Sequence, residues 1–555
     1  MRHSPKTKKL CNFPPDAAQR FGQPQSLTPA APALFLWLTP MRPLPAPVAS
    51  RLAAVLADPA GVPLPVFNSL LSALAATAEP SHAHLPLHLF RHLLLPRRRP
   101  DAFTLSALTS SLPSGATAAA AEALHAFALR LGLLHADPVL ANSLIRLYLR
   151  PPAPRPGLAR RLFDEMPART ASSYNTLISH SHTPDAADEG AWGLVRRMVA
   201  DRCAPDRFTV SAMLPACPSA RRGRELHCYA VRAGMCGAGD FHVSSGLVSM
   251  YCRVGRTDLA HTVLNGMERR NVVSWTAMVG GYTENDMFEG AVEAFRAMWL
   301  IDGILPNTIA LISVLSAIEA LSALAEGKQV HGFAVRMAMY GDVSLNNALI
   351  DTYAKCGALH YARRVFEDTS WCKDVISWGA MILGYGIHGM GVEAVDLFNQ
   401  MLASGVKPDS IVGLGVLSAC CRAGLVLKGL NIYNSIVKDH GVQPTEEMCA
   451  CIVDLLGRSG HLDHALDFIK SMSVEPGPSV WGALLDASVT HSNKEIQDLA
   501  SKSLLRLGEG KPSNLVAVSN VNASSRRWNL VERVRSTINQ GSLKKKTGRS
   551  WVNQT

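Results

Sequence analysis

The feature that most constrains this fold is a sequence repeat with a period of about a hundred residues, inside which three shorter units follow one another. The segment 375–409, VISWGAMILGYGIHGMGVEAVDLFNQMLASGVKPD, shows the plan of one unit. Apolar residues recur at helical spacing on either side of Gly389 and Gly391, and Gly405 with Pro408 ends the second apolar run. The unit therefore predicts two amphipathic helices joined by a turn, which need similar neighbours to bury their apolar faces.

Three independent series of motifs carry the same period. Each period has room for three helical hairpins, and no sustained alternation of apolar and polar residues indicates strands. The sequence therefore predicts an all-α solenoid, in which stacked hairpins bury a continuous core. The equivalent residues are Phe67, Tyr174, Trp275 and Trp378 in the first series, His125, His227 and His331 in the second, and Tyr148, Tyr251 and Tyr353 in the third.

Composition narrows the classes of function. The 12 cysteines include no Cys-x-x-Cys pair, which disfavours zinc ribbons and redox dithiols. The net charge of +11 favours an anionic partner, nucleic acid first, although a basic leader on a mildly basic surface explains it equally well. No segment reads as a transmembrane helix, so we expect no membrane insertion. No paired catalytic groups or metal ligands appear, so we expect no cofactor and no metal site.

The N-terminal fifty residues differ in composition from the rest. They contain six lysines and arginines but only one acidic residue, Asp16, and proline, alanine and serine are frequent. Such an acid-poor leader predicts an organelle transit peptide or disordered leader over residues 1–50. A basic extension without targeting meaning is the alternative, and Met41 offers a second possible start.

The repeated motifs resemble the plant pentatricopeptide repeat family, specifically its PLS subclass, in which standard, long and short repeats alternate. VVSW and VISW mark standard units, GKQVHGFAV a long unit, and NALIDTYAKCGALHYARRVF a short one. The resemblance implies a right-handed superhelical solenoid, with about twelve repeats over 64–479 and an E-type helical extension over 480–555. Many relatives continue into a DYW deaminase domain, whose zinc site needs His-x-Glu and Cys-x-x-Cys. Neither motif occurs here, so we expect no catalytic domain and no enzyme activity.

In this family, a side chain at the fifth position of a unit and another at its last position read one RNA base. Amides and hydroxyls suit this role because they match the donors and acceptors of a base edge. Asparagine and aspartate at helix starts are also common caps, which is the structural alternative. The long units, with Ser106, Ser211 and Ile312 at the fifth position, are less reliable readers. The implied pairs are Asn68 with Asp101, Asn175 with Asp206 and Asn347 with Asp374 for uridine, Ser245 with Asn271 and Thr276 with Asn307 for adenosine, and Asn142 with Thr170 and Gly379 with Asp409 without an assigned base.

The resemblance further implies that the chain binds a specific single-stranded organellar RNA, as a site-recognition factor for cytidine-to-uridine editing. A DYW-type partner would supply the deaminase in trans, helped by multiple organellar RNA editing factor proteins. The mitochondrion is favoured over the chloroplast. A factor for RNA stability, splicing or end processing is the first alternative, and a protein-binding scaffold is the second. We expect the recurring histidines and aromatic residues to pack in the core, whereas Lys544–Lys546 fits phosphate contact and a solvated tail equally well.

Overall fold

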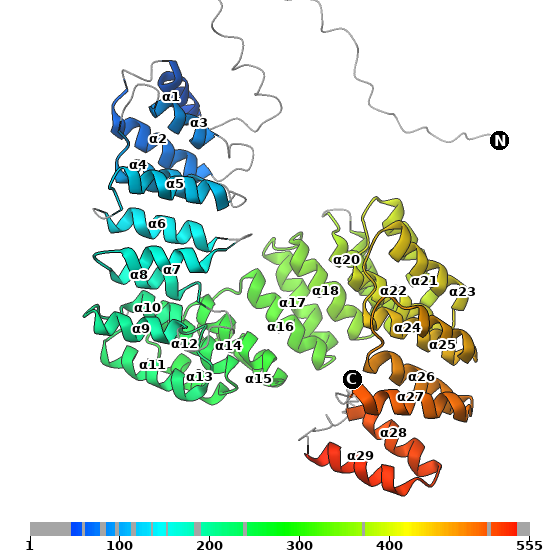
Figure 1. The fold of residues 1–555 in the computed structure, drawn as a ribbon. Helices are drawn as coiled ribbons and strands as arrows, with labels where there is room; N and C mark the ends of the chain where they lie inside the picture. The colour runs from blue at the N-terminus through cyan, green and yellow to red at the C-terminus, as the bar shows by residue number, and fades with distance from the viewer. Residues whose placement is uncertain are drawn as a thin grey trace, which may run out of the picture. The chain divides into compact units, whose positions relative to one another are not determined.

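The computed structural model describes residues 46–57, 62–77, 85–94, 99–112, 118–134, 137–150, 154–181, 190–236, 241–368, 372–507 and 512–540. The predicted leader lies outside these ranges except for residues 46–50, and the basic run at 544–546 lies outside them entirely. Every regular element within the described ranges is a helix, so the predicted all-α class is confirmed (Figure 1). None of the described helices is long and apolar enough to cross a bilayer.

The chain divides into two compact units, Met1–Ala204 and Pro205–Thr555. The first unit contains α1 (Ala46–Ala57), α2 (Leu64–Thr77), α3 (Leu85–Leu94), α4 (Ala102–Ser111), α5 (Ala118–Arg130), α6 (Pro138–Leu149), α7 (Pro156–Glu165), α8 (Ala171–Ile178) and α9 (Ala191–Ala200). The second unit begins with α10 (Arg207–Met213), α11 (Ala220–Arg232), α12 (Phe241–Arg253), α13 (Thr257–Gly266), α14 (Val272–Glu284), α15 (Phe288–Leu300), α16 (Thr308–Ala320), α17 (Leu324–Arg336), α18 (Val343–Lys355) and α19 (Leu359–Glu367). It continues with α20 (Val375–Ile387), α21 (Gly391–Ala403), α22 (Ser410–Ala423), α23 (Val426–Asn434), a π-helical turn (Ser435–Asp439), α24 (Glu446–Arg458), α25 (Leu462–Ser471), α26 (Pro478–Thr490), α27 (Lys494–Leu507), α28 (Pro512–Ser524) and α29 (Trp528–Gln540).

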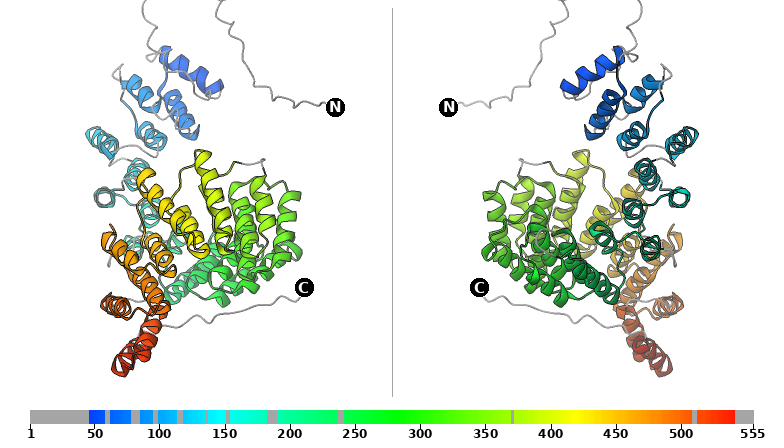
Figure 2. Two further views of the ribbon diagram at one scale, coloured as in Figure 1. Left: turned by 90° about the vertical axis from the view of Figure 1, so that its right-hand side faces the viewer. Right: turned by 90° about the vertical axis from the view of Figure 1, so that its left-hand side faces the viewer.

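From α2 onward, the even-numbered helices are the first helices of successive hairpins. Within each unit, every even-numbered helix packs against the next even-numbered helix, while each odd-numbered helix packs on the even-numbered helices beside it. Figure 2 shows this arrangement in its green segment, where helices of the second unit stand side by side in rows. The first helices therefore form one continuous layer within each unit, as a solenoid requires.

Local sequence signals set the ends of the helices. An Asp, Asn or Thr cap precedes most of the even-numbered helices, and in α20 the cap Asp374 and Ser377 form a reciprocal capping box. The turn between the two helices of a hairpin needs a left-handed residue, which is Gly389 with a φ of 73° in one hairpin. Asp286 takes the same place in an earlier hairpin with a φ of 58°, which aspartate tolerates better than most residues.

The recurring aromatic residues pack in the core, and the recurring histidines are half-buried beside it. Phe67 and Tyr174 are fully buried, and Trp275 and Trp378 are nearly so. Each recurring histidine belongs to the second helix of a long unit and meets a buried tyrosine on the first helix of the next hairpin. The distances from histidine Nδ1 to the tyrosine hydroxyl are 2.9 Å for His125 and Tyr148, 3.1 Å for His227 and Tyr251, and 2.9 Å for His331 and Tyr353.

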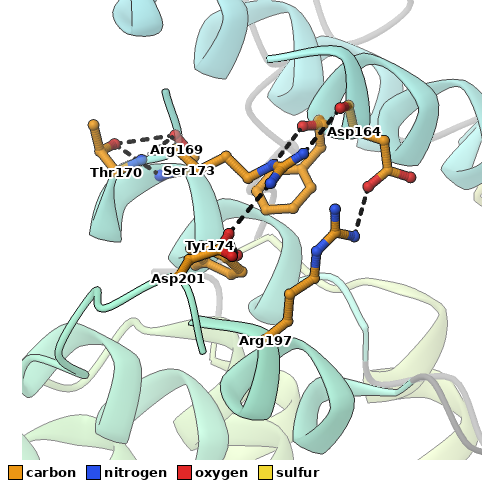
Figure 3. Close-up of polar contacts among 8 residues, drawn as sticks. Asp164, Arg169, Thr170, Ser173, Tyr174, Arg197 and Asp201 are labelled. Carbon is orange, nitrogen blue, oxygen red and sulfur yellow. Dashed lines mark hydrogen bonds and ion pairs between the residues drawn. The ribbon is translucent and has the colours of Figure 1, made fainter. Parts of the chain in front are cut away.

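A polar contact that we call the clamp joins the two helices of the hairpin α8–α9 (Figure 3). The hydroxyl of Tyr174 donates to Asp201 Oδ2 at 2.5 Å, and Arg169 Nη1 donates to the same oxygen at 3.2 Å. The Arg169 guanidinium also donates to the main-chain oxygens of Phe163 and Asp164, which belong to the preceding hairpin. The clamp therefore fixes the first helix of this hairpin against the end of its second helix and against its neighbour.

Candidate nucleic-acid interface

The last-position residues of the seven implied pairs lie at the N-termini of the first helices, where each one is an N-cap. In every case, the side-chain oxygen accepts a hydrogen bond from the backbone N–H of the third helical residue, which satisfies one of the free donors at the helix end. The donor–acceptor distances are 2.7 Å for Asp101, 3.3 Å for Thr170, 2.8 Å for Asp206, 2.9 Å for Asn271, 2.9 Å for Asn307, 2.8 Å for Asp374 and 2.8 Å for Asp409. Capping leaves part of each side chain's hydrogen-bonding capacity for a ligand.

The predicted fifth-position residues lie in the second turn of the same helices. Asn68, Asn142, Ser245 and Asn347 are 5–8% exposed, and Thr276 is half-buried. Two of the predicted pairs are hydrogen-bonded within the pair: Asn68 Nδ2 lies 3.4 Å from Asp101 Oδ1, and Asn347 Nδ2 lies 3.1 Å from Asp374 Oδ1.

Several other fifth-position groups have no protein partner among the described residues. The oxygens Asn142 Oδ1, Ser245 Oγ and Asn347 Oδ1 are buried and unpaired there. A buried polar atom without a partner costs free energy, so a ligand that supplied a donor to one of these oxygens would gain binding free energy. The amide atoms of Asn346, beside the fifth position, are buried and unpaired as well. Thr276 differs, because its hydroxyl donates to Val272 O at 2.6 Å.

The remaining predicted residues lie as follows. Asn175 is on α8 in the first unit, while its predicted partner Asp206 caps α10 in the second unit. Asp240, the last residue of the long unit with Ser211, lies outside the described residues. Gly379 contributes no side chain, and a Cβ at this position would come within 3.2 Å of Val412 Cγ2. Its pair with Asp409 therefore lacks one of the two groups.

The two aspartates that hold asparagine amides remain carboxylates at neutral pH. Burial alone would raise the pKa of Asp101, but hydrogen bonds from Thr104 and Asn68 outweigh it and leave the pKa below its usual value. The pKa of Asp374 is lowered in the same way, because hydrogen bonds from Ser377 and Asn347 outweigh the effect of burial. Both groups are therefore acceptors only, and each requires the Nδ2 side of its asparagine.

The structure adds a row of exposed apolar residues that the sequence analysis did not select. They occupy the second helical position, between the cap and the fifth residue, and they are 57–72% exposed. An apolar residue two positions after the cap, off the buried stripe of its helix, was the signal that could have identified them. These residues are Phe103, Val139, Phe208, Val273, Ile309, Ile376 and Ile411.

A polar cavity of about 190 Å³ lies between α4 and α6, one helical turn beyond Asn142. Thr109, Ser110 and Ser143 line it together with Arg146 and Arg150. The Arg150 guanidinium donates to Leu112 O at 2.8 Å, and Arg146 is exposed without an ion pair among the described residues. The cavity therefore offers positive charge and hydroxyl groups on the same layer of helices.

Two sequence periods later, at the place equivalent to Arg150, the positive charge is balanced by carboxylates. Lys355 occupies the register of Arg150, and its Nζ lies 2.6 Å from Glu319 Oε1 and 2.7 Å from Asp351 Oδ2. The basic residue at this position is thus without a carboxylate partner among the described residues at Arg150, and paired with two carboxylates at Lys355.

Comparison with known protein families gives two matches. The sequence matches the family described as PPR repeat over residues 244–272, 273–300, 376–406 and 415–440. It also matches the family described as E motif over residues 491–553.

Among curated proteins, the chloroplastic pentatricopeptide repeat-containing protein CRR2 of Arabidopsis thaliana is 36% identical over 424 residues, which cover 75% of this chain and 64% of that protein. A second chloroplastic relative from the same plant is 31% identical over 506 residues, covering 89% of this chain and 56% of its own length. A mitochondrial relative is 32% identical over 507 residues, covering 88% of this chain and 79% of its own. The chain thus spans 56–64% of the length of the two chloroplastic relatives.

Among solved structures, the crystal structure of the pentatricopeptide repeat protein PPR10 in complex with an 18-nucleotide psaJ RNA element superposes with a TM-score of 0.60. The alignment covers 88% of this chain and 81% of that one at 15% identity. This similarity establishes the shared fold, an α-solenoid of stacked helical hairpins.

Proposed function

This chain belongs to the pentatricopeptide repeat family, and we propose that it binds a specific segment of single-stranded RNA in a plant organelle. Its relatives include proteins named as chloroplastic and as mitochondrial. The basic composition of the N-terminal fifty residues favours the mitochondrion in this proposal, with the chloroplast as the alternative.

The observation that carries the proposal is a repeated register on the layer of first helices. An exposed apolar residue, a polar residue three positions later and the cap of the next hairpin occur together at α4, α6 and α14, whereas α16, α20 and α22 have Ile312, Gly379 and Leu414 at the fifth position. Apolar side chains suit contact with the flat faces of bases, and amides or hydroxyls suit their edges. The unpaired buried oxygens of Asn142, Ser245 and Asn347 would gain donors from a bound base.

The cavity between α4 and α6 supports the same proposal. Arg146 and Arg150, with the hydroxyls beside them, provide the charge and donors that a backbone phosphate requires. Because the cavity lies one turn beyond Asn142, a strand that places a base at Asn142 has a phosphate within reach of these groups.

Within this class, we assign the chain to recognition of a site for cytidine-to-uridine editing. The E motif match over residues 491–553 supports this assignment. A DYW-type protein would supply the deaminase, and multiple organellar RNA editing factor proteins would assist. Sequencing organelle transcripts of a loss-of-function plant tests the assignment: one or a few unedited cytidines would support it. Altered transcript lengths with normal editing would favour a stability, splicing or processing factor.

The base assignments are tested by selecting RNAs from a random pool with the purified protein and with Thr276→Asn. Thr276 is half-buried at the fifth position of α14 and pairs in the prediction with Asn307. We expect the wild type to enrich RNAs with adenosine at the base facing this hairpin. The substitution replaces a hydroxyl with an amide, and should change the preference at this base alone by about tenfold.

Thr283→Asn is the matched control, because Thr283 lies on the same helix but is neither a fifth-position nor a last-position residue. Its hydroxyl donates to Val279 O at 3.0 Å, much as that of Thr276 donates to Val272 O. We expect this variant to keep the wild-type preference. A wild-type protein that enriches no RNA at low salt would contradict RNA binding and favour a protein-binding scaffold. An unchanged preference in Thr276→Asn would remove this residue from the proposed readers.

A further inference from the structure

One predicted reader is held on both sides of its amide. Asn68 Nδ2 contacts the carboxylate of Asp101 at 3.4 and 3.5 Å, while Asn68 Oδ1 accepts a hydrogen bond from the Thr104 hydroxyl at 2.7 Å. Thr104 is the third residue of α4 and is fully buried. Its hydroxyl also lies 2.7 Å from Asp101 Oδ1, so its single proton is shared between the two oxygens, and the three side chains form a connected network across two hairpins of the first unit.

The network fixes which end of the amide faces which neighbour. Turning the Asn68 amide by half a turn about its last side-chain bond would place Oδ1 against the Asp101 carboxylate, where two acceptors meet without a proton. It would also take the Thr104 proton away from the amide oxygen. The donor and acceptor of Asn68 therefore keep a fixed order, with Nδ2 on the Asp101 side and Oδ1 on the Thr104 side.

The hairpin of Asn347 lacks half of this network. Asn347 Nδ2 donates to Asp374 Oδ1 at 3.1 Å, but Asn347 Oδ1 has no partner among the described residues. The third residue of the next helix is Ser377, whose hydroxyl donates to Asp374 Oδ1 at 2.7 Å and makes no bond to the asparagine. The third helical residue thus bonds to the fifth-position asparagine through Thr104, but not through Ser377 at the same position of another helix.

We propose that Thr104 is a positioning residue for base recognition, which reinforces the orientation that Asp101 sets on the amide of Asn68, so that its hairpin favours uracil over cytosine. The inference rests on the proposed RNA-binding function and names a determinant of its specificity. Uracil presents an acceptor oxygen beside the N3–H donor, whereas cytosine presents the N4 amino donor beside the N3 acceptor. A base held in one pose therefore needs opposite orders of the amide donor and acceptor for the two pyrimidines. Holding the order constant favours one pyrimidine without adding a contact to the base.

The test compares Thr104→Val, which keeps the shape and removes the hydroxyl, with Thr104→Ser, which keeps the hydroxyl. Affinities are measured for an RNA selected by the wild-type protein and for copies with uridine or cytidine at the base read by the first hairpin. That base is identified as the one whose preference disappears in Asn68→Ala. We expect Thr104→Val to reduce the ratio of uridine to cytidine affinity roughly fivefold, in line with the loss of one hydrogen bond. Thr104→Ser should keep the wild-type ratio.

Ser377→Ala provides the matched control, because it removes a capping hydroxyl at the same register without touching an asparagine oxygen. It should leave the uridine-to-cytidine ratio at the base of Asn347 unchanged, even if the affinity for all RNAs falls. Thr104→Ala is a second variant without the hydroxyl, in case the valine disturbs folding, and melting followed by circular dichroism reports on that.

The results separate the two proposals. A wild-type protein without RNA affinity would overturn the proposed function and this inference with it. A wild-type protein that prefers uridine at this base, with Thr104→Val and Thr104→Ala weakening both RNAs equally, would overturn the inference alone and leave Thr104 as a helix cap. An equal loss of ratio in Ser377→Ala would also overturn it.

Discussion

The hairpins α14–α15 and α20–α21 occupy the same place in successive triplets, yet their two helices are held together by different contacts. In α14–α15, Trp275 Nε1 donates to Asp302 Oδ2 at 2.8 Å, and Arg270 Nη1 lies 3.0 Å from Asp302 Oδ1. This is a second copy of the clamp seen at Tyr174 and Asp201. In α20–α21, Ser404 takes the place of the aspartate, and its hydroxyl donates to Met401 O of its own helix at 2.7 Å.

The hairpin α20–α21 is held instead by close approach of its helices to α22. Added Cβ atoms at Gly386 and Gly391 would come within 3.0 Å of Ala419 Cβ and 2.5 Å of Ala423 Cβ on α22, respectively. Thr283 and Phe288 occupy the equivalent places in α14–α15, so this tight packing is specific to α20–α21. The difference teaches that the hairpin fold tolerates exchange of a polar contact for glycine-mediated packing. The residue at the fifth position differs as well, because α20 has Gly379 where α14 has Thr276.

The largest effect in this comparison is expected for Gly391→Ala. Its new methyl group would meet both Ala423 Cβ and, at 2.9 Å, the carbonyl oxygen of Ala419, and backbone atoms cannot move aside cheaply. We expect α20–α22 to lose about 3 kcal/mol of local stability, at the upper end for overpacking. Native-state hydrogen exchange measures this, because amide protection reports on local opening.

Gly389→Asp is the control for that substitution. Gly389 has open space around its Cα and a φ of 73°, and Asp286 already adopts this conformation in the second copy. Its cost should be smaller, on the order of 1 kcal/mol, because only backbone strain is added. Equal losses of protection in the two variants would show that the turn, and not the contact with α22, controls the stability of this hairpin.

A smaller effect is expected when the clamp is broken by Asp302→Ala. Arg270 and Asp302 are largely buried as a pair, with side chains 26% and 19% exposed. Removing the carboxylate leaves Trp275 Nε1 and the Arg270 guanidinium without their acceptor, so we expect a loss of about 2 kcal/mol in α14–α15. Hydrogen exchange of amides in α14 measures it.

Ser404→Ala tests the same register in the copy without a clamp. Because the Ser404 hydroxyl bonds only to its own helix, its removal should cost less than about 0.5 kcal/mol. Asp302→Asn keeps an acceptor for Trp275 but removes the charge, and should fall between the two. Should Asp302→Ala be as mild as Ser404→Ala, the clamp would be a consequence of the packing and not a contributor to it.

The sequence predicted the hairpins better than the contacts that distinguish them. The apolar spacing and the glycines of 375–409 predicted both helices, because a period of 3.6 residues and a turn are local properties. The contact between Thr104 and Asn68 could not be predicted in this way, since it joins residues on two hairpins. The clamp was equally hidden, because Asp201 and Asp302 look like ordinary polar residues after a helix.

Part of the candidate interface was also accessible from the sequence. The repeat register located the asparagines and caps correctly relative to the helix starts, and their role in base reading stays a prediction. The exposed apolar residues, such as Phe103 and Val273, were missed because apolar residues in a helix are read first as core. Only their position opposite the buried stripe distinguishes them.

The smallest expected effect on stability comes from the three histidine–tyrosine pairs, which are the same in each sequence period. Burial lowers the pKa of His125, of His227 and of His331, while Glu165 partly opposes this at His125 and Arg364 adds to it at His331. In the unfolded chain each histidine titrates near its ordinary pKa of about 6.5. As the pH falls below that value, the unfolded state takes up protons that the folded state does not, so stability decreases. Thermal melting at pH 7.5 and 5.5 should therefore show lower stability at the acidic pH.

Two variants of the third pair separate the causes of this pH dependence. His331→Gln removes the titrating group and should make the difference between pH 7.5 and pH 5.5 smaller. Tyr353→Phe removes the hydroxyl that lies 2.9 Å from His331 Nδ1 but keeps the ring that buries it. Because burial is the largest cause of the lowered pKa, this variant should be less stable at both pH values while keeping the difference between them. If Tyr353→Phe instead abolished the pH dependence, the hydrogen bond and not burial would set the protonation state of this histidine.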